Sequence, residues 1–264
     1  MNCLVKEKTN VKKVGKGDGT TNRIIVGIPG FDQLIEGGIE KNSIVLIAGG
    51  TGTGKTSFST QFLHHGAHQG EKALYISFEE APEQILKHAN SFCSECKINP
   101  EKNNIRFQKV DVYKVAKAVE ASILKARGDL LIDVKGLPVM IPPGYNPDRI
   151  VVDSLPALSA VFKPDDYRYF VFKFFSFLKS LGATVFAVTE TTQDPTEFSR
   201  TGIEEFLGDG VIVLYNLKQG DIRVRAVEIL KMRGTVHKEK IVPFKITTKG
   251  IEVYPDQSIL MQVE

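Results

Sequence analysis

Short apolar runs alternate with stretches of helical periodicity along the first three quarters of the chain. The apolar runs have the length of buried strands, and the segments between them carry apolar residues three or four positions apart. This alternation is typical of a mostly parallel sheet covered by helices on both faces. We expect strands at 43–50, 72–80, 104–112, 149–154 and 184–190, and helices at 55–70, 81–93, 115–128 and in a stretch that ends at Leu181.

The pattern changes after Gly208. Residues 210–234 and 242–255 read as strands joined by glycine turns, with too few residues between them for helices. Such strands must pair antiparallel. The predicted architecture is therefore one α/β domain over 24–264, with a mostly parallel central sheet, flanking helices and C-terminal antiparallel strands, without a second domain or an internal repeat.

One segment departs from this pattern. Residues 129–148, "DLLIDVKGLPVMIPPGYNPD", are apolar, contain a Lys-Gly turn signal and end in a proline-rich stretch. We interpret the segment as a small inserted hairpin whose exposed apolar surface would suit a subunit contact.

Charge is distributed unevenly along the chain. The net charge is +3, but residues 1–23 carry six Lys or Arg against two Asp or Glu, which leaves the remainder near −1. A short lysine-rich terminus is usually a solvated, flexible arm, and binding of nucleic acid by it is the less favoured alternative. The same polar start does not resemble a signal peptide, so export is not expected.

The cysteines and the longest apolar run point to a cytoplasmic protein. An odd count, Cys3, Cys93 and Cys96, argues against a disulfide framework and for a reducing cytosol. Cys93 and Cys96 form a C-x-x-C, but no second pair completes a zinc set, so helix-end thiols are favoured over a metal or redox role. The apolar run from Tyr169 is too short to span a bilayer and contains two lysines.

The strongest chemical signal is the motif "GGTGTGKTS" after the first buried strand. It matches G-x-x-x-x-G-K-[ST] and opens a helix, which is the context that a phosphate-binding loop requires. Its glycines let backbone N–H groups face an anion, Lys55 adds a cation, and Thr56 offers a hydroxyl to Mg²⁺. The ATP-binding residues predicted here are Gly50, Thr51, Gly52, Thr53, Gly54, Lys55, Thr56 and Ser57.

Acidic residues follow two other predicted strands. Asp153 ends the run "RIVVDS" and is favoured as a magnesium-side carboxylate, with capping of the next helix as the alternative. Glu79 and Glu80 end the strand after the phosphate-loop helix, where they are candidates to activate water, with Glu79 as the better base. Their alternative role is to favour the positive N-terminus of the following helix.

With these motifs in place, the chain resembles the KaiC-like ATPases of the RecA superfamily. The resemblance rests on "VGIPGFDQLIEGGI", the phosphate loop, "SFEE", "RIVVDS", "AVTE" and "LKMRGTVH", which occur in the family's order from about residue 24 to about residue 256. It implies a RecA-like fold, ATP and Mg²⁺ binding, and slow ATP hydrolysis at the subunit interfaces of a homo-oligomeric ring, commonly a hexamer. KaiC itself has two such domains, so its clock function and autokinase activity are not carried over to this single copy, and the 129–148 segment has no counterpart that can be aligned.

The resemblance also implies roles for particular residues. The paired catalytic glutamates correspond to Glu79 and Glu80, the magnesium-side carboxylate to Asp153, and the sensor strand end to Thr189 and Glu190. A further ATP contact corresponds to Ser91. Contacts made in trans, to a neighbour's nucleotide, correspond to Arg225, Lys231, Met232, Arg233, Thr235 and His237.

A trans role for Lys231 and Arg233 also has a chemical reason. Two cations one residue apart at a strand end are usually only solvated, but an arginine supplied in trans commonly stabilises the charge on a transferred phosphoryl group. Arg200 in the loop after Glu190 is a competing candidate. The alternative function is a nucleotide-gated DNA-recombination paralogue or an assembly scaffold with little turnover, although the acidic character of that loop opposes DNA binding.

Overall fold

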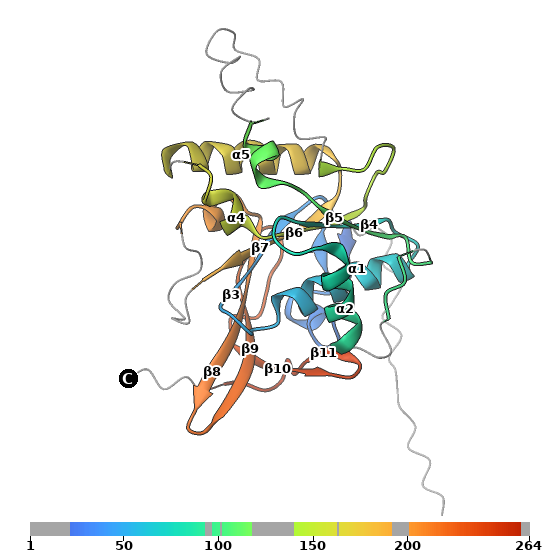
Figure 1. Cartoon of the computed structure of the whole chain (residues 1–264). Coiled ribbons are helices and arrows are strands. Elements are labelled where there is room, and N and C mark those ends of the chain that lie inside the picture. Colours follow the sequence, from blue (N-terminus) through green and yellow to red (C-terminus); the bar gives the residue numbers. More distant parts are fainter. Residues whose placement is uncertain are drawn as a thin grey trace, which may run out of the picture.

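The computed structural model describes residues 22–92, 97–100, 102–117, 140–162, 164–191 and 201–259. Its centre is a nine-stranded sheet of order β11-β10-β9-β8-β3-β7-β6-β4-β5 (Figure 1). The strands are β3 (Ile44–Gly49), β4 (Ala73–Ser77), β5 (Ile105–Lys109), β6 (Arg149–Asp153), β7 (Thr184–Glu190), β8 (Gly210–Gln219), β9 (Ile222–Met232), β10 (Val242–Thr247) and β11 (Gly250–Val253).

The direction of the strands changes where the sequence pattern changes. Strands β3 to β8 pair in parallel with one another, whereas β9, β10 and β11 each run antiparallel to their neighbour. The predicted parallel core with C-terminal antiparallel strands is therefore confirmed.

Helices cover both faces of the sheet. They are α1 (Lys55–His68), α2 (Pro82–Phe92), α4 (Leu155–Ser159), α5 (Pro164–Ser180) and α6 (Glu204–Leu207), with a 3-10 helix η1 at Asp32–Leu34. Side chains of β3 alternate between the faces: Val45 and Ile47 pack in the cluster that contains α1 and α2, and Ile44 and Leu46 in the cluster that contains α4 and α5. The single helix expected to end near Leu181 is thus two helices, α4 and α5.

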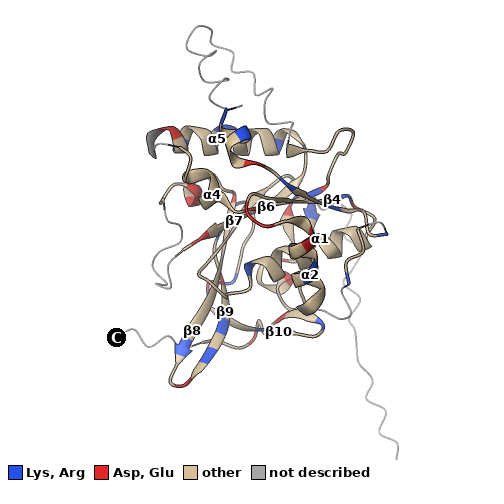
Figure 2. Ribbon diagram, viewed as in Figure 1, with Lys and Arg blue, Asp and Glu red and all other residues tan. Residues whose placement is uncertain are grey.

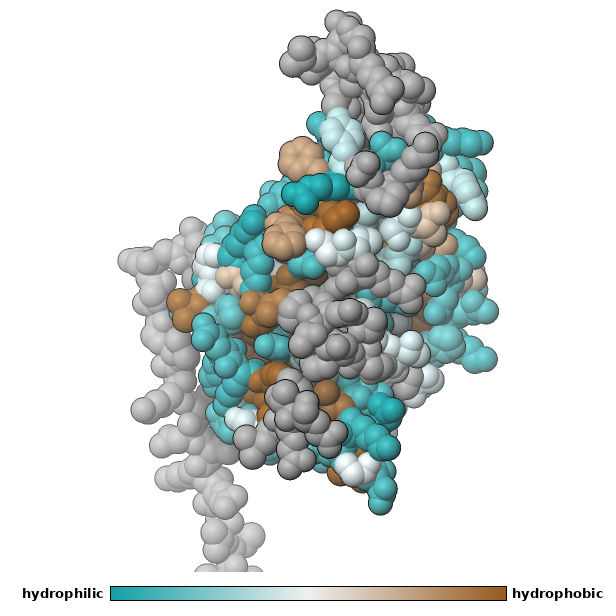
Figure 3. Space-filling view, turned by 90° about the vertical axis from the view of Figure 1, so that its left-hand side faces the viewer, coloured by the Kyte–Doolittle hydropathy of each residue, from teal (hydrophilic) through white to brown (hydrophobic). Residues whose placement is uncertain are grey.

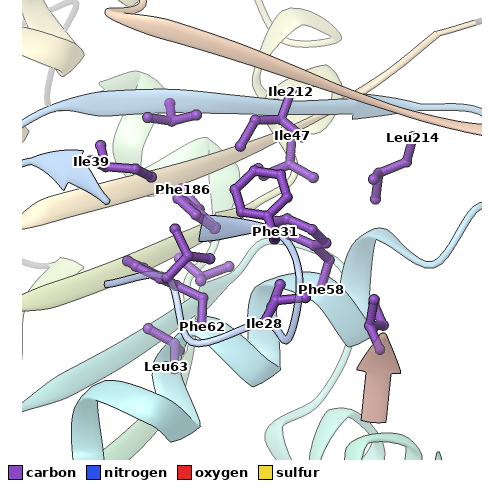
Figure 4. Packing of buried hydrophobic residues seen from close by; sticks show 14 of the residues in the cluster. Ile28, Phe31, Ile39, Ile47, Phe58, Phe62, Leu63, Phe186, Ile212 and Leu214 are labelled. Carbon is purple, nitrogen blue, oxygen red and sulfur yellow. The ribbon is translucent and has the colours of Figure 1, made fainter. Parts of the chain in front are cut away.

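Aromatic rings fix α1 against the sheet. Phe62 stacks on Phe186 of β7 with ring centroids 3.8 Å apart, and Phe58 meets Phe31 edge to face at 5.1 Å (Figure 4). Behind them the buried Arg149 donates to the carbonyl oxygen of Phe62 and pairs with Glu71. This packing holds α1 in one orientation, and with it the loop that precedes its first residue.

The first described strand begins one residue before the predicted start of the domain. Arg23, counted above with the N-terminal arm, instead opens β1 (Arg23–Ile24), which pairs antiparallel with β2 (Ile39–Glu40). Its guanidinium donates to the Gly38 carbonyl oxygen at 3.0 Å and to Thr235 Oγ1 at 2.8 Å. Residues 1–21 of the predicted arm lie outside the described residues, as do Cys93, Cys96 and Arg200.

The predicted hairpin at 129–148 is described only from residue 140 onward. In this part Met140 is fully buried and Tyr145 is 7% exposed, and the Tyr145 hydroxyl donates to the carbonyl oxygens of Ala73 and Asn104. These two side chains pack into the domain instead of offering the exposed apolar surface that we expected. Within the part of the chain that the structure describes, no helix is both long and apolar enough to cross a membrane.

Candidate active site

The loop between β3 and α1 has the backbone of an anion cradle. Gly52 and Gly54 adopt positive φ values of 75° and 100°, which favour glycine. The N-cap of α1 is Gly54, which has no side chain to cap the first turn, so the backbone N–H groups of this turn are directed at the loop. Lys55 Nζ folds back to donate to the carbonyl oxygens of Gly49 at 2.8 Å and Gly50 at 3.0 Å. The loop therefore offers N–H donors and a cation to an anion.

Three carboxylates lie near enough to Lys55 to influence its charge. Burial lowers the pKa of Lys55, and the negative charges of Glu190, Asp153 and Glu79 oppose that shift. Strand register explains the gathering, because Glu190 of β7 pairs with Gly49 and Asp153 of β6 pairs with Ser77 of β4. The predicted acids therefore meet at the carboxyl edge of the parallel strands, beside the phosphate loop.

Asp153 is bound by a residue outside the predicted site, Tyr75. The hydroxyl of Tyr75, in β4, donates to Asp153 Oδ2. Burial raises the pKa of Asp153, and the Tyr75 bond partly offsets that rise. The N-cap of α4 is Ser154, so the alternative in which Asp153 caps this helix is not what the structure has. The only signal for Tyr75 in the sequence was a tyrosine within the apolar strand "KALYISFEE".

The two glutamates after β4 point in different directions. Ser77 Oγ accepts from the backbone N–H groups of Glu79 at 3.3 Å and Glu80 at 3.0 Å, which fixes the bend that carries both. Glu79 Oε1 accepts from Ser154 Oγ at 3.2 Å, next to Asp153. Glu80 Oε2 lies 3.5 Å from His88 Nδ1 on α2. Glu79 thus lies beside Asp153, and Glu80 faces α2.

Thr189 lies in β7 beside the phosphate loop. It pairs with Ala48, one residue before the pairing of Glu190 with Gly49. Its side chain is fully buried, and Oγ1 is without a hydrogen-bond partner among the described residues. A buried hydroxyl left without a partner is costly and indicates a position that serves an absent ligand or stores strain.

Lys231 and Arg233 lie at the end of the strands that is opposite to the phosphate loop of the same chain. Gly49 is level with Leu214 and Val227, whereas Met232 pairs with Gly210 at the start of β8. Four residues of β8 separate Leu214 from Gly210, or about 13 Å, because a register shift in β9 takes up its extra residue. The two cations therefore stand well away from the Lys55 site of the same chain.

In this chain the two cations rest on α6. Lys231 Nζ donates to the carbonyl oxygens of Glu205 at 3.0 Å and Gly208 at 2.7 Å, and burial lowers its pKa. Arg233 donates to the carbonyl oxygen of Phe206 at 3.4 Å and lies 3.7 Å from Asp209. Arg233 remains more than half exposed, so its guanidinium is accessible from outside the domain.

The other expected contact residues are dispersed. Arg225 Nε donates to Gly52 of its own phosphate loop at 3.3 Å, so this residue has a contact within its own subunit, whereas the family resemblance implied a trans role. Lysine and arginine residues lie on the β8–β9 hairpin (Figure 2), and among them Lys218 and Arg223 are directly opposite each other. Ser91 is exposed near the end of α2, with its hydroxyl bonded to the His88 carbonyl oxygen.

Three further predicted contact residues, Met232, Thr235 and His237, lie in the "KMRGTVH" stretch. Met232 is 7% exposed under Gly210, and Thr235 Oγ1 accepts from Arg23. His237 Nδ1 is buried without a hydrogen-bond partner among the described residues.

A parallel sheet with a glycine-rich loop before α1 and carboxylates at the same edge defines a nucleotide-binding protein of the P-loop class. The chain belongs to the family described as "ATPase: KaiC", whose model matches residues 24–258. Its fold is accordingly of the RecA type, as expected from the sequence.

Relatives of two lengths match the chain. The circadian clock oscillator protein KaiC of Acaryochloris marina is 32% identical over 257 residues, which cover 94% of this chain and 48% of that protein. A UPF0273 protein of Thermotoga maritima is 34% identical over 239 residues, which cover 89% of this chain and 97% of that protein. A solved KaiC-like protein of Pyrococcus horikoshii superposes with a TM-score of 0.71 at 33% identity, covering 89% of this chain and all of that one. The chain thus spans about half the length of the KaiC relatives and nearly all of the shorter ones.

Proposed function

We propose that this chain is a magnesium-dependent ATP hydrolase that acts in a homo-oligomeric ring, with each active site completed by the adjacent subunit. Its turnover would drive or time a conformational change of the ring, a regulatory role carried out in the cytoplasm. The observation that carries the proposal is the division of the catalytic residues between two edges of the sheet. Phosphate loop and carboxylates share one edge, and Lys231 and Arg233 lie at the other.

The residues at the carboxyl edge fit ATP and Mg²⁺. The first turn of α1 offers backbone N–H donors to phosphate oxygens, and the buried Thr189 hydroxyl lies one residue before Glu190 at the same end of the sheet. Thr56 and Asp153, the latter bound by the Tyr75 hydroxyl, would hold the metal ion, which neutralises phosphate charge when bound. Burial disfavours the charged forms of both Lys55 and Asp153. Such opposed, desolvated charges are typical of a site prepared for a charged ligand.

Glu79 is the proposed general base and Glu80 its partner. Glu79 is exposed, so water can reach it, and its hydrogen bond from Ser154 orients the carboxylate beside Asp153. Glu80 lies next in the chain on the same Ser77-supported bend. Glu190 and Thr189 at the end of β7 would sense whether the γ-phosphate is present, because both residues adjoin the phosphate loop in register.

The other edge supports an intersubunit role. Arg233 is exposed, and two large apolar side chains lie near it. Phe206, whose carbonyl oxygen accepts from Arg233, is 66% exposed, and Val236, three residues further along the chain, is 72% exposed. Figure 3 shows that hydrophobic residues interrupt the hydrophilic cover on one face of the molecule. Exposed apolar groups beside an accessible cation are typical of a subunit contact.

Mixing of two inactive variants tests the division of the site. Lys55→Ala subunits lack the phosphate-loop cation but retain Arg233, and Arg233→Ala subunits have the reverse defect. In a randomly mixed ring about a quarter of the interfaces pair an intact loop with an intact arginine, so up to about a quarter of the wild-type ATPase rate should return. Arg200→Ala in place of Arg233→Ala tests the competing loop arginine.

The size of the particle provides the second test. Light scattering with and without ATP and Mg²⁺ should detect a ring in at least one condition. A strict monomer under every condition, or mixed rings without any recovery of ATPase activity, would contradict the proposal.

A further inference from the structure

Two histidines on the last turns of α1 bring their ring nitrogens together. His64 and His68 are four residues apart, and their Nε2 atoms are 3.1 Å from each other. The ring centroids are 4.4 Å apart, with planes inclined at 68°. His68 is exposed and His64 is half-buried, so the pair is accessible from solvent. Neither residue belongs to the phosphate loop or to its carboxylates.

The spacing of this pair suits metal coordination, and burial lowers the pKa of His64 to about 4. Two nitrogens 3.1 Å apart that both bond a metal ion at about 2.0–2.1 Å subtend about 95–102° at the metal. This angle lies between the square-planar and the tetrahedral values.

We infer that His64 and His68 form a two-residue chelating site for a borderline divalent transition-metal ion, with water completing its coordination. Copper, nickel and zinc ions prefer imidazole nitrogen, whereas Mg²⁺ prefers oxygen. The site has two protein ligands, because no group of three or more His, Cys, Asp or Glu residues gathers among the described residues. His65 is directed mainly elsewhere, since its larger charge interactions are with Arg149, Asp32 and Glu71, and that with His68 is the smallest.

The position of the pair in the helix favours a cation. The last turn of α1 contains no lysine or arginine, and its basic residues are His65 and His68. A divalent ion there would interact favourably with the negative end of the helix dipole. Lys55 precedes His64 by nine residues, or about 13 Å of helix, so an ion at the pair does not enter the phosphate site.

Titration of the tag-free full-length chain with Ni²⁺ tests the inference. Excess Mg²⁺ is included so that the oxygen ligands near Asp153 do not contribute, and nucleotide is omitted. We expect one Ni²⁺ per chain by calorimetry. His64→Gln and His68→Gln should each weaken binding about tenfold or more, because chelation by two linked ligands is lost. His88→Gln, which alters an exposed histidine on α2, should leave the affinity unchanged.

Two further readouts do not depend on how well the half-buried His64 variant folds. Cu²⁺ bound to the wild-type chain should show hyperfine coupling to two nitrogens, and the exposed His68→Gln variant should lose one of them. At a free Ni²⁺ concentration a hundred times Kd, the folded-to-unfolded ratio should rise about a hundredfold without nucleotide. The 3.1 Å distance also fits an N–H···N hydrogen bond between the rings. Absence of one-to-one binding, or equal affinity in the wild type and His68→Gln, would mean that only this bond exists and would overturn the inference.

Discussion

Replacing Thr189 by valine should make the protein more stable and less active. Thr189 is fully buried in β7, and its hydroxyl has no hydrogen-bond partner among the described residues. A buried polar group without a partner costs about 1–3 kcal/mol, and valine has nearly the shape of threonine. Thr189→Val should therefore raise the free energy of unfolding of the nucleotide-free protein by about 1–3 kcal/mol. For a chain of this size that is about 2–4 °C in Tm for each kcal/mol.

The same strand offers a matched control. Thr184 is also buried, at 2% exposure, but its Oγ1 accepts from the backbone N–H of Asn42 at 3.1 Å. Thr184→Val leaves that N–H without an acceptor, so it should lower the free energy of unfolding by about 1–3 kcal/mol. Two identical substitutions five residues apart in β7 should thus shift stability in opposite directions.

Urea unfolding without nucleotide measures both shifts, and steady-state ATP hydrolysis measures the functional effect. If the Thr189 hydroxyl serves the nucleotide, Thr189→Val should reduce ATPase activity about tenfold, equivalent to about 1.4 kcal/mol of transition-state stabilisation. Thr184→Val should leave the rate per folded molecule close to that of the wild type. A loss of stability in Thr189→Val would refute the reasoning, because it would mean that the hydroxyl has a partner.

Three other substitutions give distinct outcomes. Because burial raises the pKa of Asp153, the folded state holds this proton more tightly than the unfolded state, and stability falls as pH rises from 3.8 through the raised pKa. Asp153→Asn should remove this pH-dependent loss of stability, so that urea titrations show a more stable nucleotide-free protein at neutral pH. The same substitution should abolish Mg²⁺-dependent hydrolysis. Unchanged stability at pH 7 would contradict the expected effect. In a solvent-exposed helix, Gly→Ala would stabilise by about 1 kcal/mol. Gly66→Ala should instead lower Tm, because the added Cβ would clash with the Arg149 side chain, which is fixed by its bond to Phe62. Lys231→Met leaves two carbonyl oxygens at α6 without their donor and should cost about 1 kcal/mol; hydrogen exchange should be faster at the end of α6 and unchanged in α1.

Much of the fold and of the phosphate site was predictable, because local patterns encode them. The period of apolar residues identified the strands around the loop, and the spacing of Gly49, Gly54 and Lys55 identified the loop itself. The gathering of Glu79 and Asp153 followed from a general property of parallel sheets, whose carboxyl ends meet at one edge. These features depend on short segments and on a rule that holds for any such sheet.

Other features depend on contacts between distant segments, which no local pattern records. Tyr75 could be recognised as a partner of Asp153 only once β4 and β6 were adjacent, and Arg23 joined the domain through contacts with Gly38 and Thr235. The burial of Met140 and Tyr145, in a segment for which an exposed apolar surface was expected, is likewise a result of packing.

The sequence by itself determined the class of chemistry, since an anion cradle, a lysine and strand-end carboxylates are defined by residue type and spacing. Only the tertiary structure decided how those groups are divided. Antiparallel pairing of β9 with β8 carries Lys231 and Arg233 to the edge opposite the phosphate loop, while it brings Arg225 back to Gly52. The physical reason is that strand direction and register, which are set by the packing of the whole sheet, determine at which edge each side chain emerges.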